Sequence, residues 1–149
     1  MTGTPHLRRP LRVAALALVA LVALSGCLSQ AQTRDVTLIN QARAAAGKRA
    51  LGVHAAAASK AQAWSEHMAR TGVLEHTGGG GAVDPAPLRG WCSYYENVGM
   101  GGSVDAVHKA FLASPSHKAN MLSSSTVVGT GVVARGGRVW VTEIYLRTC

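Results

Sequence analysis

Residues 111–122 read FLASPSHKANML, a stretch in which one helix is expected to end and another to begin. The Ser114-Pro115 pair should end a helix that starts at Ser103, because the residue before a proline is driven out of the α region. Ser116 can then cap a short new helix, which places His117 in its first turn. An imidazole at a break between two helices points into the space that the break opens, so His117 is a candidate site residue.

Two further groups of the same kind lie upstream. His76 stands in LEHTGGGG and Glu96 stands in YYENVG, and we predict that both converge with His117 on one cavity. The spacing alone indicates this weakly, since the three residues are far apart and form no local ligand motif such as HExxH. The remaining histidines are assigned to the N-terminal segment or to helix surfaces; these are His6, His54, His67 and His108.

The chain starts with a pattern typical of an export signal. Three arginines, at positions 8, 9 and 12, precede twelve unbroken Ala, Val and Leu residues over 13–24. That length suits a signal peptide and is too short to span a bilayer. The following Leu24-Ser25-Gly26-Cys27 resembles the lipobox of bacterial lipoproteins, in which the cysteine is lipidated and becomes the new N-terminus.

We therefore predict a signal peptide over 1–27, a tether over 28–33 and one domain over 34–149. Lipid on Cys27 would hold the domain at the outer side of the cell membrane. A plain signal peptide with a chance cysteine, and hence a secreted protein, is the alternative.

The formal net charge of the whole chain is +8, and removal of the three N-terminal arginines would leave +5. Outside the cytoplasm, a mildly basic domain would attract anionic headgroups or cell-wall polymers. The sequence contains no Lys/Arg run with interleaved aromatic residues, so we expect no nucleic-acid partner.

Cysteine usage agrees with export. Of three cysteines, lipidation of Cys27 would leave Cys92 and Cys149 as an internal pair. An even remainder in an oxidising compartment favours one disulfide. The bond would fasten the end of the chain to the segment that carries Glu96, and it would stabilise the fold by about 4 kcal/mol in the loop-entropy model. Two free thiols are the alternative.

Hydrophobic periodicity and turn residues predict helix, helix, strand, helix and hairpin, in that order. The second hairpin strand is apolar on both faces, as a central strand covered on both sides should be. These elements pack most simply as an α+β fold in which a small sheet has helices on both faces. The first expected helix runs from a Thr33 cap to Gly47 with Asp35 in its first turn, and the second covers 55–71 and is stopped by Gly72. A loop over 75–88 and a strand over 91–98 follow, and then a helix that is capped by Ser103 and marked by Val104, Val107, His108 and Phe111. The last two strands, over 126–134 and 139–146, are joined by a type I′ turn at Gly136-Gly137.

Six short segments occur in an order that is characteristic of one protein family: LINQAR at 38–43, HT at 76–77, ENVG at 96–99, SPSHKANML at 114–122, GTGV at 129–132 and WVTEIYL at 140–146. Together they resemble the CAP superfamily, which comprises cysteine-rich secretory proteins, antigen 5 and plant pathogenesis-related class 1 proteins. The likeness is greatest to its compact bacterial branch, often called SCP or allergen V5-like domains. It covers residues 36–146, and ENVG and SPSHKANML are its most specific pieces.

The resemblance implies a three-layer α-β-α sandwich of CAP type with a small, mainly antiparallel sheet. It implies that His76, Glu96 and His117 line a cleft. It also suggests that Asn97 and Asn120 serve the structure by bonding backbone groups near this cleft.

The family pattern includes a second cleft acid, for which Glu143 is the candidate here. Many relatives carry a glutamine after the corresponding threonine. The neighbours of Glu143 on one strand face are Val139, Val141 and Tyr145, so its carboxylate lies either at an edge of the sheet or in a cavity.

The preferred function is a membrane-anchored CAP-domain lipoprotein that binds a small apolar or cell-wall-derived ligand in the His/Glu-lined cleft, without catalysis. No cofactor is required for this function, although His76, Glu96 and His117 could hold a divalent metal such as zinc. The alternative is a metal-dependent hydrolase with Glu96 as general base and with His76 and His117 as metal ligands. A thiol peptidase with Cys92 as nucleophile and His117 as base is a third hypothesis, which pairing of Cys92 with Cys149 would exclude.

Overall fold

A computed structural model of the protein describes residues 28–149, and the predicted signal peptide with Cys27 lies outside the described residues. Among residues 28–149, no helix combines the length and the apolar character needed to cross a membrane. The elements are α1 (Gln30–Ala45), β1 (Gly52–Val53), α2 (Ala55–Thr71), β2 (Trp91–Gly101), α3 (Val104–Ala113), α4 (Pro115–Met121), β3 (Val127–Arg135) and β4 (Arg138–Thr148).

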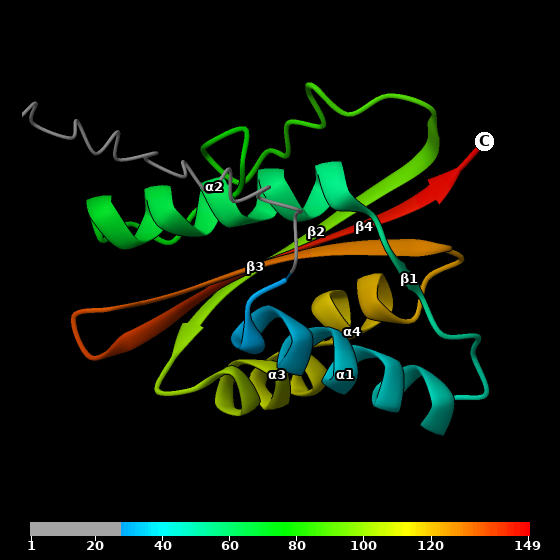
Figure 1. Cartoon of the computed structure of the whole chain (residues 1–149), viewed down its shortest axis with the longest axis horizontal. Coiled ribbons are helices and arrows are strands. Elements are labelled where there is room, and N and C mark those ends of the chain that lie inside the picture. The colour runs from blue at the N-terminus through cyan, green and yellow to red at the C-terminus, as the bar shows by residue number, and fades with distance from the viewer. Residues whose placement is uncertain (1–27) are drawn as a thin grey trace, which may run out of the picture.

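The fold has three layers. Figure 1 shows α2 along one face of the sheet, with α1, α3 and α4 gathered on the other face. The strand order is β1-β3-β4-β2, and β4 lies in the interior between two antiparallel neighbours. The two-residue strand β1 runs parallel to β3, so the sheet is mixed. The predicted α+β sandwich with a mainly antiparallel sheet is confirmed.

The first helix begins earlier than predicted. Ser29, and not Thr33, is its N-cap: the Ser29 hydroxyl accepts from the Gln32 N–H, and the Gln32 side chain accepts from the Ser29 N–H. Because α1 starts at Gln30, most of the predicted tether over 28–33 is helical. Asp35 consequently lies in the second turn, where it is buried, instead of at an exposed helix N-terminus.

The predicted helix break is present, but its cap differs. α3 follows the Ser103 cap as predicted, and Ser114 has an extended backbone with φ −93° and ψ 120°. Pro115 occupies the start of α4, so Ser114 and not Ser116 is the N-cap. The Ser114 hydroxyl makes no capping bond to the helix backbone and instead contacts the His117 ring, with Oγ 2.8 Å from Nδ1.

The C-terminal hairpin has the predicted turn. Gly136 and Gly137 have φ values of 61° and 71°, and a type I′ turn requires positive φ at both central residues. The strand β4 extends slightly beyond the predicted 139–146, and every residue over 140–146 is buried. This burial agrees with the expectation of a central strand covered on both faces.

The helix α2 packs closely on the sheet because small residues form both surfaces. Ala57 and Ala61 lie on its buried face, and Gly129 and Gly131 lie beneath them on β3. A Cβ at either glycine would overlap the helix backbone at these alanines. The GTGV segment therefore uses glycine for close approach of two backbones.

Cys92 and Cys149 are joined by a disulfide, with their Cα atoms 5.1 Å apart. The bond links the start of β2 to the residue that follows β4, and these ends are paired in the sheet. The predicted pairing is present, so Cys92 is not available as the thiol nucleophile of a peptidase.

Candidate functional site

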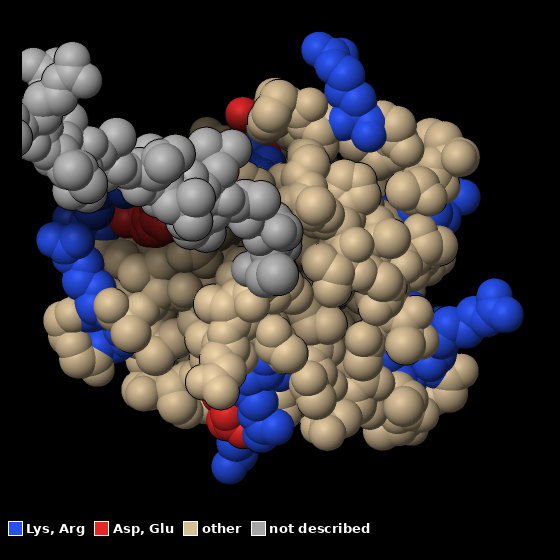
Figure 2. All heavy atoms as spheres, in the orientation of Figure 1, with Lys and Arg blue, Asp and Glu red and all other residues tan. Residues whose placement is uncertain are grey.

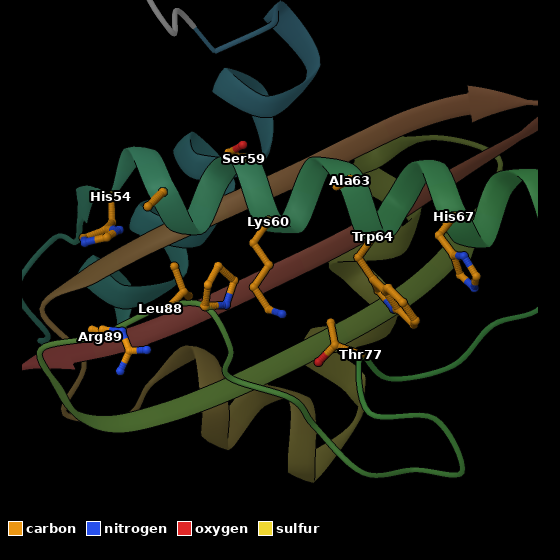
Figure 3. A pocket seen from close by; sticks show the side chains of 11 residues that line it. His54, Ser59, Lys60, Ala63, Trp64, His67, Thr77, Leu88 and Arg89 are labelled. Atoms are coloured by element: carbon orange, nitrogen blue, oxygen red, sulfur yellow. The ribbon is translucent and has the colours of Figure 1, made fainter.

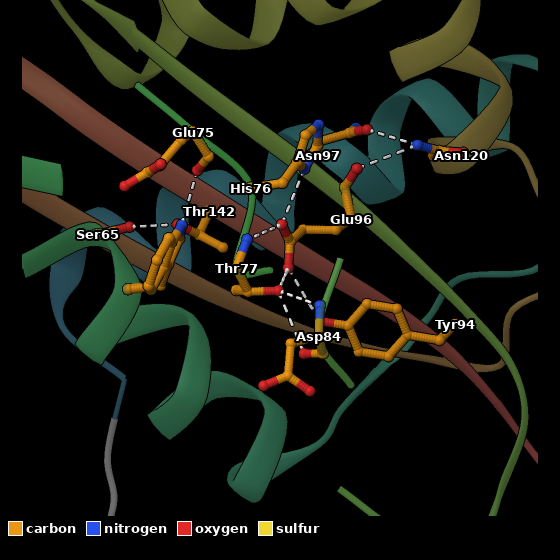
Figure 4. A network of polar contacts seen from close by, with 11 residues as sticks. Ser65, Glu75, His76, Thr77, Asp84, Tyr94, Glu96, Asn97, Asn120 and Thr142 are labelled. Carbon is orange, nitrogen blue, oxygen red and sulfur yellow. Dashed lines mark hydrogen bonds and ion pairs between the residues drawn. The ribbon is translucent and has the colours of Figure 1, made fainter. Parts of the chain in front are cut away.

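Glu96 is the centre of a polar network between β2 and the loop that precedes it (Figure 4). Its Oε1 accepts from the Thr77 N–H at 2.9 Å and lies 2.8 Å from His76 Nδ1. Its Oε2 accepts from the Thr77 hydroxyl at 2.7 Å and from the Tyr94 hydroxyl at 3.0 Å. A carboxylate offers about four acceptor positions. The four contacts of Glu96 therefore occupy all the acceptor positions of its carboxylate, which is almost fully buried.

Further contacts give the glycine-rich loop over 75–88 a defined path, although it contains no helix or strand. The Thr77 hydroxyl accepts from the Asp84 N–H at 2.8 Å. Trp64 on α2 donates from Nε1 to the Glu75 carbonyl at 2.8 Å. The contacts of the HT pair with Glu96 thus anchor this loop to the sheet, and the bond from Trp64 anchors it to α2.

His117 lies on α4, near this network. Its Nδ1 contacts the Ser114 hydroxyl, and its ring packs on Phe111 with centroids 4.9 Å apart. Burial lowers the pKa of His117, and the neighbouring His76 lowers it further, which favours a neutral imidazole. Of the three predicted cleft residues, His76 and Glu96 are in direct contact, while no hydrogen bond in the described chain joins His117 to either.

Asn97 and Asn120 connect β2 to α4. Asn120 Nδ2 donates to the Glu96 carbonyl at 3.2 Å and to Asn97 Oδ1 at 2.9 Å. Asn97 Nδ2 donates to the His117 carbonyl at 3.1 Å and to Glu143 Oε2 at 2.9 Å. Both amides therefore bond the backbone of a candidate site residue and hold α4 against the sheet.

Glu143, the candidate for the second cleft acid, pairs in register with Asn97 and not with Glu96. It is fully buried on the interior strand β4. Adjacent residues of a strand point to opposite faces. Glu143 therefore faces α1 and α3, whereas Glu96 points to the α2 side with Val98, which packs on α2.

Asp35 on α1 and Glu143 on β4 bring two carboxyl groups together in the core. Burial raises the pKa of Asp35 well above its usual range, and the charge of Glu143 raises it further. Burial also raises the pKa of Glu143 to about 7, although hydrogen bonds with Tyr145, Asn97 and Asp35 act to lower it. Two buried carboxylates cannot both be ionised without a counter-charge, so this pair needs a proton or a cation.

Within residues 28–149, one group of three His, Cys, Asp or Glu side chains has all its ligand atoms within 4.8 Å of one another: Asp35, His108 and Glu143. The predicted zinc ligands His76, Glu96 and His117 do not form such a group. Predicted to lie on a helix surface, His108 is instead only 7% exposed. Within the described residues, this close grouping of ligand atoms therefore lies in the core.

A groove with a volume of about 660 Å³ lies beside the Glu96 network, between α2 and the loop over 75–89 (Figure 3). Trp64, Pro87 and Leu88 give it apolar walls, and Thr77 is the residue that it shares with the network. The remaining larger side chains around it are basic or potentially basic: His54, Lys60, His67 and Arg89.

Sequence reasoning missed the core cluster although part of its signal is present. His108 is at helical spacing with Val104 and Phe111, which places it on the buried face of α3. Asp35 likewise shares a helical stripe with the buried Ile39. The groove had no comparable signal, because its two walls come from separate elements that meet through the tertiary structure.

An α-β-α sandwich with a loop histidine and a strand glutamate in contact, beside a helix break at Ser-Pro, defines a recognisable class of domain. The chain belongs to the CAP family: the profile described as "CAP: Cysteine-rich secretory protein family" matches residues 36–145. No curated protein matches the chain. The resemblance that the six segments indicated is confirmed.

Solved structures with this fold come from distant organisms. An outer surface protein from Borrelia burgdorferi has a TM-score of 0.69 at 15% identity, covering 78% of this chain and 92% of its own. Venom allergen-like protein 4 from Schistosoma mansoni has a TM-score of 0.65 at 13% identity, covering 82% of this chain and 91% of its own. An extracellular SCP-domain protein from Bacillus anthracis has a TM-score of 0.65 at 19% identity, covering 83% of this chain and 45% of its own. At these identities the likeness concerns the fold alone.

Proposed function

We propose that this protein is an extracytoplasmic CAP-domain binding protein that holds a small amphiphile in the groove between α2 and the loop over 75–89. The ligand would have an apolar chain and an anionic head. The observation that carries this proposal is the groove itself, whose volume of about 660 Å³ is in the range of small-molecule sites. The function is binding without catalysis and requires no cofactor.

The apolar part of the groove is ordered before any ligand arrives. Trp64 is held by its bond to the Glu75 carbonyl and by stacking on His67, with ring centroids 4.5 Å apart. Pro87 and Leu88 belong to the loop on the opposite side. An alkyl chain in such a groove would gain roughly 0.8 kcal/mol for each methylene that it buries.

The charges around the groove favour an anionic head. Lys60 and Arg89 line the groove together with two histidines, and no acidic side chain is among the lining residues. Figure 2 shows a visible face formed mostly by uncharged atoms, with Lys and Arg projecting at its margins beside a few Asp and Glu. Attraction between opposite charges would select anionic over cationic amphiphiles.

The family and the sequence support a location outside the cytoplasm. The matching profile is that of a secretory protein family, and the disulfide between Cys92 and Cys149 suits an oxidising compartment. The lipobox pattern that ends at Cys27 supports a lipid anchor in the cell membrane. Such an anchor would place the groove near membrane lipids and cell-wall polymers. Anionic fragments of the cell wall are therefore the second class of candidate ligand, after anionic amphiphiles. If Cys27 is not lipidated, the same domain would be secreted.

The contacts of Glu96 do not favour the hydrolase alternative. A general base needs a free acceptor position for the proton that it removes. In Glu96, the bonds from His76, Thr77 and Tyr94 occupy these positions. The network acts as the support of the loop that forms one wall of the groove.

Titration of residues 28–149 with dodecanoate below its micelle concentration tests the proposal, with tryptophan fluorescence and calorimetry as readouts. We expect micromolar binding, and at least tenfold weaker binding of dodecyltrimethylammonium. A soluble anionic wall fragment tests the second ligand class in the same assay.

Ala63→Phe should abolish dodecanoate binding, because it fills the groove from an exposed position on α2. Ala55→Phe is the matched control, since Ala55 is exposed on the same helix and does not line the groove. Equal dodecanoate affinities of the wild type and Ala63→Phe would show that the groove is not the binding site.

A further inference from the structure

We propose that Asp35, His108 and Glu143 form a buried site for a divalent transition-metal cation, which fastens α1 and α3 to β4. Each ligand comes from a different one of these elements. The site lies on the other side of the sheet from the groove and from the Glu96 carboxylate. It is independent of the proposed ligand-binding function.

Each of the three residues carries a buried polar atom that no neighbouring N–H or O–H group satisfies, apart from a proton that Asp35 and Glu143 can share. These atoms are Asp35 Oδ2, His108 Nδ1 and Glu143 Oε1. Among the described residues, the other such side-chain atoms are Ser93 Oγ and Trp140 Nε1, so three of the five gather at one point. Unpartnered buried polar atoms are rare in folded proteins, because nothing replaces the water that they lose. Their convergence indicates a missing common partner.

The Glu143 carboxylate is oriented for this partner. Its Oε2 accepts from the Tyr145 hydroxyl at 2.5 Å and from Asn97 Nδ2 at 2.9 Å, which fixes the carboxylate and leaves Oε1 without a bond to either residue. Outer contacts of this kind commonly orient the ligands of a metal. Around a tetrahedral zinc ion with bonds of about 2.1 Å, ligand atoms lie about 3.5 Å apart. Small side-chain rotations would bring atoms that lie within 4.8 Å of one another to that spacing.

A divalent cation would balance the charge of the cluster. Two carboxylates and a neutral imidazole around such an ion carry no net charge, as a buried position requires. In the described part of the chain, no Lys or Arg forms an ion pair with Asp35 or Glu143. The buried Arg43 donates instead to the carbonyls of Met121 and Ser123.

The donor atoms indicate the class of ion. One imidazole nitrogen with two carboxylates suits Zn²⁺ and related first-row ions, whereas Ca²⁺ and Mg²⁺ prefer oxygen ligands alone. The ligands are 1%, 7% and 0% exposed, so the ion would have a structural role and would enter most readily during folding.

The test is zinc loading of the full chain in a mild detergent. The protein is unfolded in urea with its disulfide intact and refolded with Zn²⁺ or with EDTA, and unbound metal is then removed. We expect about one zinc per chain by elemental analysis, and a higher thermal midpoint than in the EDTA sample. Refolding with Co²⁺ should give the visible absorption bands of a tetrahedral nitrogen and oxygen site.

Both His108→Ala and the nearly isosteric Glu143→Gln should weaken metal binding by at least tenfold. His76→Ala is the matched control, because it removes a histidine of the predicted cleft and should leave loading unchanged. Circular dichroism identifies the variants that are folded, and Glu143→Gln alone suffices if His108→Ala does not fold.

Two results would overturn the proposal. If the folded wild type retains no zinc and shows no cobalt bands, the acid pair holds a proton in place of a metal. If His76→Ala loses the metal while Glu143→Gln keeps it, the ion belongs to the other side of the sheet.

Discussion

The two faces of the sheet are built in different ways. On the α2 face, Gly131 meets Ala61, and the helix approaches the strand until no further atom fits between them. On the α1 and α3 face, polar side chains are buried between the layers: Gln32 Nε2 donates to the Thr130 carbonyl at 2.6 Å, and farther along Asp35 faces Glu143. The first face depends on close approach of two backbones, whereas the second combines a hydrophobic cluster with buried hydrogen bonds and charge, so each should respond to a different kind of substitution.

The largest effect is expected from added volume on the α2 face. Gly131→Ala should lower the free energy of unfolding by roughly 3 kcal/mol or more, because the new Cβ overlaps the backbone of α2 at Ala61. Urea denaturation followed by circular dichroism measures this loss. Gly102→Ala is the matched control, since no atom lies within 4 Å of its Cβ position, and it should stay within about 0.5 kcal/mol of the wild type. Equal losses in both variants would disprove close packing as the cause.

On the opposite face, removal of a single buried donor should also be costly. Asn97→Ala leaves the His117 carbonyl without this donor and takes one of two bonds from Glu143 Oε2. We expect a loss of about 2–3 kcal/mol in the same assay, since buried acceptors without donors keep their desolvation cost. The exposed Gln41→Ala on α1 should be nearly neutral. A neutral Asn97→Ala would contradict the division between the two faces.

The buried acids should make the stability of the metal-free protein depend on pH. The pKa of Glu143 is raised to about 7 from 4.5, so the folded state binds a proton more tightly than the unfolded state. The resulting stability is fully present below about pH 4.5 and is lost as the pH rises through about 7. The raised pKa of Asp35 acts in the same direction, and the other polar groups of this region are His108, Tyr145 and Arg43.

Urea denaturation in EDTA at pH 5 and pH 8 should therefore show a decrease of roughly 1–3 kcal/mol that is attributable to this pair. Glu143→Gln removes the titrating group and should reduce the difference. An unchanged difference in this variant would assign the pH dependence to other groups.

The smallest effect is expected where the α2 face is polar. The Ser65 hydroxyl donates to the Gly131 carbonyl and bonds the Thr142 hydroxyl, each at 2.9 Å. Ser65→Ala should cost about 1 kcal/mol, because Thr142 and Gly131 are left with one bond fewer. A loss as large as that of Asn97→Ala would mean that both faces depend on hydrogen bonds to the same degree.

Local signals account for the parts of the fold that the sequence predicts well. The helix over 55–71 ends at Gly72, whose φ is 72°, and the hairpin turns at Gly136 and Gly137, whose φ values are also positive. Glycine adopts positive φ more readily than other residues, so these positions could be predicted from the sequence. The start of α1 was missed, although Ser29 and Gln32 have the spacing of a capping box, because they follow directly on the lipobox pattern. The strand β1 was also missed, since two residues carry no periodicity.

The candidate site was less predictable, because it depends on register. His76 and Glu96 are in contact, and this proximity was expected from the family resemblance and not from their spacing. The face to which Glu143 points depends on its pairing with Asn97 instead of Glu96, and a shift of one residue would reverse it. Asp35 is far from Glu143 in the sequence, so only the packing of α1 on the sheet brings them together.

The position of β4 has a consequence for how the chain reaches its folded state. This strand comes last among the elements, yet it lies inside the sheet and pairs with both β2 and β3. The parallel pairing of β1 with β3 likewise joins residues from the two halves of the chain. Folding therefore depends on contacts of long sequence separation and should be slow. The sheet should therefore stay incomplete until the hairpin has been synthesised, so the domain should fold only after its last strand is available.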